Sequence, residues 1–277
     1  MPKLTHSILL TGPSGAGKST FARGALVAEG SGLVLASPLD ELDSYYGLEP
    51  PRYVLHSFDD ADYLPSEAAD KIGQPTGLRD AVRWLRLRYV EVAEDAKNGK
   101  PPRYAVLVLD TVSALGTLAT NAAMAKYGRN EPPAAMSPDG AAFYTYLRQR
   151  QEEILRLARA FRGFGVHLIA LSHVVETDVK ETTVAKMIEG TSRMHMPAVP
   201  GAFRAALPSF FSTVLYAGVV PGKDGGRLHY VQWKADPKRP TKNRFGDLDV
   251  NDRIKNDWLT VTQKIEAAAA AKFKEGK

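Results

Sequence analysis

The chain has no cysteine among its 277 residues, and this absence excludes two kinds of site. Without thiols it can form neither a disulfide bridge nor a zinc site held by thiolates. It also has no run of about 18 apolar residues, so the sequence predicts no membrane-spanning helix. Residues 1–11 lack the ordered charged, apolar and small-residue segments of a secretory signal. We therefore expect a cytoplasmic protein with no membrane contact.

A strong charge of either sign is also missing. The 36 lysines and arginines exceed the 31 acidic residues by only five, which gives a net charge of +5. This weak basicity permits contact with nucleic acid without requiring it. Hydrophobic residues make up 44% of the chain and charged residues 24%, as is typical of a globular protein large enough to bury a full core.

Residues 12–20 read GPSGAGKST and match every fixed position of the Walker A phosphate-binding loop. Glycines let such a loop wrap its backbone N–H groups around phosphate oxygens, and the following helix adds its positive N-terminal end. The apolar strand expected at residues 6–11 and the helix from about residue 17 to residue 29 provide the right context. The motif predicts binding of ATP with Mg²⁺. The residues assigned to the loop are Gly12, Pro13, Ser14, Gly15, Ala16, Gly17, Lys18, Ser19 and Thr20.

Within this loop, two side chains have specific roles. Lys18 is expected to reach the β- and γ-phosphates, and the Ser19 hydroxyl to ligate Mg²⁺. The apolar run at residues 104–110 ends in Asp110, as a buried parallel strand of the Walker B type does. Asp110 is the second expected metal ligand, acting through water.

A third apolar strand, residues 166–171, ends next to His173. A polar residue at this position can sense the γ-phosphate and pass its loss to the following segment. The alternative is a histidine that only satisfies local hydrogen bonds at a strand end, and the sequence favours neither interpretation.

Helical spacing predicts further helices at residues 76–97 and 141–162, and two apolar runs at 212–219 and 228–233 predict a β-hairpin. The fold expected from this order is α/β: a twisted, mainly parallel sheet with helices on both faces and a C-terminal antiparallel hairpin. We expect one ATPase domain over residues 1–263. Residues 264–277, rich in alanine and lysine, read as a helix that frays into a basic tail.

The segments at residues 12–20, 104–116, 165–173 and 208–248 together resemble a RecA-like P-loop ATPase. They are most similar to the compact phage-encoded ATPases that look like shortened recombinases and act in single-strand annealing or recombination. The resemblance implies nucleotide and metal roles for Lys18, Ser19 and Asp110, and the γ-phosphate sensor position for His173. It also implies a location in the cytoplasm of a bacterial host.

A RecA-type enzyme has a glutamate after its second strand that orients the attacking water. Here that region is ASPLDELD, residues 36–43, and the sequence does not identify a single acid in it as the water-orienting residue. Glu41 and Asp40 are the candidates, and either could instead be an ordinary carboxylate at a helix start or in a loop.

The resemblance also implies that two segments contact single-stranded DNA. We expect residues 116–140 and 174–200 to be long loops, the first carrying a basic and aromatic cluster suited to stacking bases and neutralising phosphates. The alternative for each is an ordinary flexible surface loop. The candidate DNA-binding residues are Lys126, Tyr127, Arg129, Lys186 and Arg193.

Residues 234–244 are strongly basic, and the resemblance assigns such residues to the γ-phosphate of a neighbouring subunit. Lys242 and Arg244 would form this finger pair in a ring or short filament. A DNA-backbone patch and a solvated basic turn are the competing interpretations.

The function expected from the sequence is a slow ATPase whose nucleotide cycle is coupled to single-stranded DNA binding. Two alternatives stay open: a nucleotide-gated switch or loader for a replication protein, and a small-molecule kinase. Expected partners are single-stranded DNA, further copies of the chain, and a single-strand binding protein or other replication partner.

Overall fold

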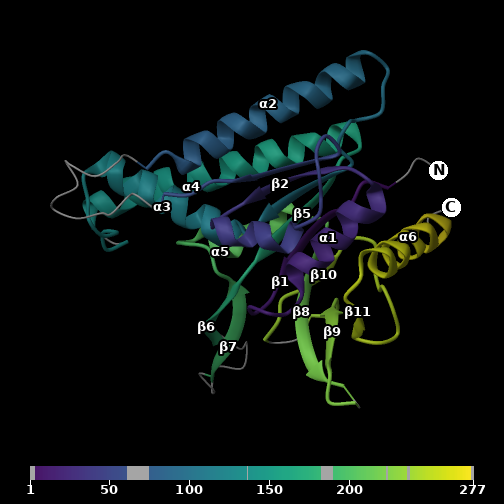
Figure 1. The fold of residues 1–277 in the computed structure, drawn as a ribbon. Helices are drawn as coiled ribbons and strands as arrows, with labels where there is room; N and C mark the ends of the chain where they lie inside the picture. The colour runs from purple at the N-terminus through teal and green to yellow at the C-terminus, as the bar shows by residue number, and fades with distance from the viewer. Residues whose placement is uncertain are drawn as a thin grey trace.

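The computed structural model describes residues 4–60, 75–135, 137–181, 190–222, 224–235 and 238–275. Its central feature is a nine-stranded sheet (Figure 1). Along one path the strands follow the order β11-β9-β8-β1-β5-β4-β2-β3, and β10 pairs with β8 off that path. The expected mixed α/β fold with a mainly parallel sheet is confirmed.

Six strands form the parallel part of the sheet: β1 (Ser7–Thr11), β2 (Gly32–Ala36), β3 (Tyr53–Ser57), β4 (Val106–Asp110), β5 (His167–Ser172) and β8 (Thr213–Pro221). All five residues of β1, β2 and β4 are buried, because helices cover both faces of the sheet. β5 lies between β1 and β4. The carboxyl ends of these three strands therefore meet at one edge, where polar residues can gather.

Alternation along the strands divides the core into two clusters. On β4, Leu107 and Leu109 belong to one cluster, and Val106 and Val108 belong to the other. The first cluster packs under α2 (Gly77–Lys97), α3 (Val112–Tyr127) and α4 (Pro138–Ala160). The second packs under α1 (Lys18–Glu29), η1 (Leu39–Tyr45) and α6 (Trp258–Glu275) (Figure 1). Short helices η3 (Phe161–Phe164), α5 (Phe203–Ala206) and η4 (Leu207–Phe210) connect the larger elements.

An antiparallel extension continues the sheet beyond β8. β9 (Arg227–Gln232) pairs with β8 as the expected hairpin, and β11 (Arg253–Lys255) pairs with β9. The two-residue strand β10 (Lys242–Asn243) pairs with the first residues of β8. The C-terminal hairpin predicted from the sequence is confirmed.

The prediction of a long loop at residues 116–140 was wrong. Helix α3 begins directly after Thr111, whose hydroxyl accepts a hydrogen bond from the Ala114 N–H as an N-cap, and it ends at the left-handed Gly128. Leu115, Leu118 and Ala119 are buried at helical spacing. The connection to α4 spans only residues 128–137. Lys126 and Tyr127 therefore lie in the last turn of a helix, and Arg129 directly follows it.

Residues 174–200 are not a long loop either. They contain the two-stranded antiparallel sheet of β6 (Val174–Glu181) and β7 (Gly190–Pro197), which leaves the body of the protein after His173. Alternating β-branched and acidic residues at 175–179 carry the strand signal that the loop interpretation overlooked. Arg193 lies on β7, and Lys186 lies outside the described residues.

Much of the segment expected to fray lies within a helix. Helix α6 continues to Glu275, and Val261 and Ile265 are buried against the face that α1 also covers. Its first residue, Trp258, is 1% exposed and donates a hydrogen bond from Nε1 to Glu29 on α1. No helix of the described residues is long and apolar enough to cross a membrane.

The Trp258 ring anchors α6, and removing it tests how much this docking contributes to stability. The ring packs edge-on against Phe21 and His6. We expect Trp258→Ala to lower the free energy of unfolding by about 3–5 kcal/mol, because it leaves a cavity and removes the hydrogen bond to Glu29. Urea unfolding followed by circular dichroism measures the change. Phe273→Ala, which removes a 62% exposed ring from the same helix, is the control and should cost less than about 0.5 kcal/mol. Equal effects of the two substitutions would contradict the anchoring role.

Candidate functional site

The phosphate-binding motif forms the turn between β1 and α1. Gly15 and Gly17 have positive φ angles of 73° and 82°, which glycine adopts at little cost. A Cβ on Gly12 would collide with the carbonyl oxygen of Ala217 on β8. These glycines let the loop lie flat against the sheet edge, with the N-terminus of α1 opening into a cavity.

Lys18 is held beneath this loop. Its side chain is buried, and Nζ donates hydrogen bonds to the carbonyl oxygens of Gly12 at 3.0 Å and Pro13 at 2.8 Å. Burial lowers the pKa of Lys18, and the negative charges of Asp110 and Glu41 oppose this effect. An ammonium group has three donors, so this placement suits a lysine that also binds a phosphate oxygen in the cavity.

Asp110 lies at the carboxyl end of β4 and is 1% exposed. The Tyr45 hydroxyl donates a 2.8 Å hydrogen bond to its Oδ2 atom. Burial raises the pKa of Asp110 to about 6, while the hydrogen bonds from Tyr45 and Ser19 lower it. The Asp110 carboxylate and the Ser19 hydroxyl are the hard oxygen donors that Mg²⁺ prefers, so these residues fit a magnesium ion.

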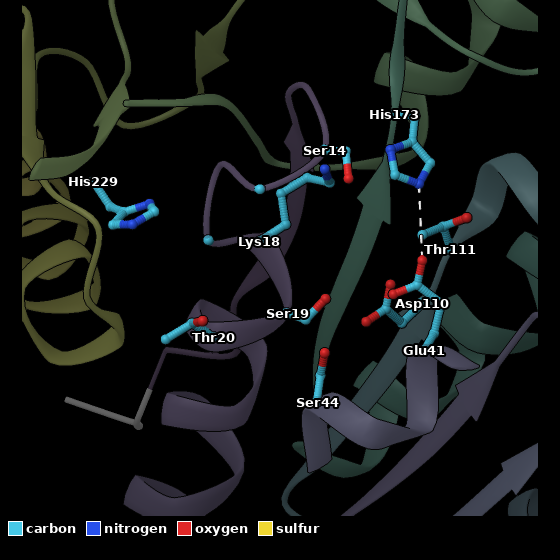
Figure 2. Close-up of a pocket in the computed structure, with 12 residues that line it drawn as sticks. Ser14, Lys18, Ser19, Thr20, Glu41, Ser44, Asp110, Thr111, His173 and His229 are labelled. Carbon is cyan, nitrogen blue, oxygen red and sulfur yellow. Dashed lines mark ion pairs between the residues drawn. The ribbon is translucent and has the colours of Figure 1, made fainter. Parts of the chain in front are cut away.

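Glu41 and His173 face the same cavity from the same end. Glu41 lies on η1, and its Oε1 atom is 3.9 Å from Nε2 of His173, as the dashed line in Figure 2 marks. Burial and the charge of Lys18 lower the pKa of His173, which favours the neutral imidazole, while the charge of Glu41 opposes this effect. Asp40, the other acid considered, is exposed and is not among the residues lining the cavity.

The cavity has a volume of about 310 Å³ and is open to solvent. It brings together the loop, both predicted metal ligands, and the Glu41 and His173 candidates. Its lining residues are Ser14, Gly15, Gly17, Lys18, Ser19, Thr20, Glu41, Ser44, Asp110, Thr111, His173 and His229.

Several side chains at this site were missed by the sequence analysis. Tyr45 hydrogen bonds to Asp110, His229 lines the cavity, and Asn256 donates from Nδ2 to the carbonyl oxygens of Ala16 and Gly17 at 3.2 and 3.1 Å. Asn256 is 239 residues from Gly17, and no local pattern marks it. Tyr45 follows the candidate acids Asp40 and Glu41 closely in the sequence, and this position was the one local signal that its hydroxyl could reach the site.

The predicted finger pair lies away from the cavity of its own chain. Lys242 pairs with Val214 near the start of β8, and the backbone N–H of Arg244 donates to Ser212. Burial lowers the pKa of Lys242, and the neighbouring charges of Arg244 and Arg159 lower it further. Neither residue lines the cavity. A role at a γ-phosphate would therefore require a second copy of the chain.

A second, larger cavity of about 710 Å³ lies between α2, α3 and α4, and we call it the basic groove. Lys126 lies over the Tyr146 ring, 3.9 Å from its centroid. Among the described residues that line the groove, Glu153 is the one acid, and it bonds Arg86 and Arg150. Five cationic side chains line the groove: Arg79, Arg83, Arg86, Lys126 and Arg150.

The other DNA-binding candidates are placed differently. Arg129 forms a 2.6 Å ion pair with Asp139 at the start of α4, and the Tyr127 hydroxyl donates to the Ala142 carbonyl. Neither residue lines the basic groove. Of Lys126, Tyr127 and Arg129, whose side chains the structure describes, only Lys126 lines this cationic surface.

A family model described as an AAA domain matches residues 5–245 of the chain. The chain belongs to this family. It is a nucleotide-binding P-loop ATPase, in agreement with the loop, strand order and cavity described above. A search of curated proteins found no match. The finer resemblance to recombinase-type annealing ATPases stays a prediction.

Two solved structures are similar to the chain only at the level of the fold. One is the pilus retraction motor PilT with bound ADP, at 11% identity and a TM-score of 0.35, covering 98% of this chain and 53% of that one. The other is the ATPase DotB of Legionella pneumophila, at 13% identity and a TM-score of 0.32, covering 98% and 52%. The chain thus spans about half the length of both proteins.

The hydrogen bond from Tyr45 predicts how Asp110 titrates. It stabilises the ionised carboxylate, so Tyr45→Phe should raise the pKa of Asp110 above its value of about 6. The variant should hold the protonated form to higher pH. Carboxyl-carbon NMR titration of the metal-free protein measures this shift. Tyr46→Phe, at an exposed neighbour, should leave the titration unchanged. An unshifted or lowered pKa in the Tyr45 variant would contradict the assignment.

Proposed function

We propose that the protein binds ATP with Mg²⁺, hydrolyses it slowly, and couples this cycle to the binding of single-stranded DNA. The nucleotide-binding part of this proposal rests on one observation: Lys18, Ser19, Asp110 and Glu41 line a single cavity. A positive side chain, two metal-binding oxygens and an acid within one cavity match the needs of phosphoryl transfer to water.

Each residue has a defined role in this reaction. The loop N–H groups and Lys18 bind and orient the phosphates, and Ser19 and Asp110 would hold Mg²⁺. When bound, the metal neutralises negative charge on the phosphate oxygens. Glu41 accepts a hydrogen bond from the attacking water, and the neutral His173 donates one to the γ-phosphate. Both lie on the rim opposite Lys18 (Figure 2).

Charge complementarity supports the DNA part of the proposal. The basic groove combines five cationic side chains with one acid that is already paired. Tyr146 offers a ring at the same place, although Lys126 and Arg150 both lie over it. Cationic side chains that neutralise phosphates, together with an aromatic ring, are what binding of single-stranded nucleic acid uses. We assign the DNA to this groove, with the β6–β7 hairpin as the second surface.

Assembly is a further part of the proposal. Because Lys242 and Arg244 are remote from the cavity of their own chain, we propose that they serve a neighbouring copy in a ring or short filament. A single-strand binding protein or other replication partner would act at the same DNA. The protein would work in the cytoplasm of a bacterial host.

Phosphate release with and without single-stranded DNA tests the coupling. We expect DNA to stimulate turnover of the wild type, and Lys18→Ala to abolish both activity and ATP binding. Glu41→Gln should keep ATP binding but reduce turnover by about 10²–10⁴-fold, since only the water-orienting carboxylate is lost. A turnover rate that does not change when DNA is added would contradict the proposed coupling and favour a nucleotide-gated switch or a small-molecule kinase.

Charge reversal in the basic groove tests where DNA binds. Arg79→Glu combined with Arg83→Glu should weaken the binding of an oligonucleotide by at least about tenfold and flatten its salt dependence, by a slope of about 0.7 per lost phosphate contact. Fluorescence anisotropy over a range of salt concentrations measures both effects. The control, Lys97→Glu with Lys100→Glu, makes the same charge change at the last residue of α2 and three residues beyond it. Equal loss in both double variants would mean that only overall charge matters.

A further inference from the structure

The nucleotide cavity has two chemically different ends. Asp110, Glu41 and His173 lie at one end, and Thr20 and His229 lie at the other, with Lys18 between them (Figure 2). The metal ligands and the water-orienting candidate mark the γ-phosphate end. The nucleoside of a bound nucleotide must therefore extend out of the cavity toward Thr20 and His229.

The wall at this second end comes from the C-terminal part of the chain. His229 lies on β9, and Asn256 lies between β11 and α6. A Cβ built on Gly17 would be only 2.9 Å from Nδ1 of His229 and 2.8 Å from Nδ2 of Asn256. The hydrogen bonds from Asn256 to Ala16 and Gly17 join this wall to the loop. His229 is thus held at the rim beside the start of α1.

A third cavity continues from this end. It has a volume of about 390 Å³, lies between α1 and the start of α6, and shares Thr20 with the nucleotide cavity. Two of its lining residues are large apolar side chains left open to solvent: Val27 is 57% exposed and Leu259 is 53% exposed. An apolar surface beside a phosphate site suits a nucleobase, which is flat and apolar on its faces.

We propose that the nucleoside half of the bound nucleotide occupies this end, with the ribose against His229 and the base in the cleft against Val27 and Leu259. The phosphates then fix the ligand in the loop, while β9 and α6 distinguish a nucleotide from a bare polyphosphate. This inference rests on the ATP binding proposed above and is independent of DNA.

Two variants and three ligands test it. His229→Ala and Leu259→Ser should each weaken the binding of ATP and ADP by about five- to tenfold, as the loss of one contact to a ribose or base does. Inorganic tripolyphosphate with Mg²⁺ lacks the nucleoside, so its affinity should stay within about twofold of the wild type. Isothermal titration calorimetry measures all three ligands. Leu228→Ser is the control, because Leu228 is 57% exposed on β9 and lines neither cavity.

Two outcomes would overturn the proposal. Equal loss of ATP and tripolyphosphate affinity would place the effect on the phosphates or the loop. Unchanged affinity for every ligand would place the nucleoside elsewhere. A wild-type protein that bound neither ATP nor tripolyphosphate would instead contradict ATP binding itself. Thermal unfolding of each variant separates loss of a contact from loss of the fold.

Discussion

Two opposite charges buried at one edge of the sheet set the main constraint on this structure. Lys18 and Asp110 are 6% and 1% exposed, and burying either charge alone would be costly. Two loop carbonyls accept hydrogen bonds from Lys18, and Tyr45 donates one to Asp110. Because burial still raises the pKa of Asp110 to about 6, these bonds only partly offset the loss of water. A buried charge that is only partly compensated in this way is typical of a site that binds a charged ligand.

The loop that carries Lys18 depends on residues far away in the chain. Gly12 lies against the carbonyl of Ala217 on β8, and Asn256 bonds the carbonyls of Ala16 and Gly17. The antiparallel extension and α6 therefore do more than cover the edge of the sheet. They fix one side of the phosphate loop, while η1 brings Glu41 and Tyr45 to the other. The site is assembled from both ends of the chain.

The sequence predicted correctly those features that depend on a local pattern of residues. The glycines of the loop, the buried strand before Asp110 and the apolar runs of β8 and β9 predicted the sheet and its hairpin correctly. The Walker A and Walker B segments also predicted residues that the structure places in one cavity, although their roles stay predictions. Helix α3 was mistaken for a loop because the family resemblance implies a DNA-contacting loop after the strand that ends in Asp110, and Gly116 within the helix weakens the helix signal. Its Cβ position is filled by Pro200, a tertiary reason that no local pattern reveals. Tyr45, His229 and Asn256 reach the site through long-range packing alone.

Helix α3 runs from the nucleotide cavity, at Thr111, to the basic groove, at Lys126. It starts two residues after Asp110 and has 16 residues, a length of about 24 Å, with Lys126 in its last turn. At its first turn, Ser113 accepts a hydrogen bond from the backbone N–H of His173 and shares another with the Ser172 hydroxyl. A shift of His173 on loss of the γ-phosphate would therefore act on the start of α3 as well as on the β6–β7 hairpin that His173 precedes. Since a packed helix moves as a unit, the groove at its far end would feel the same shift. In the proposed function, the coupling between nucleotide and DNA would therefore run through α3, the helix found where a loop was expected, and would need no flexible loop.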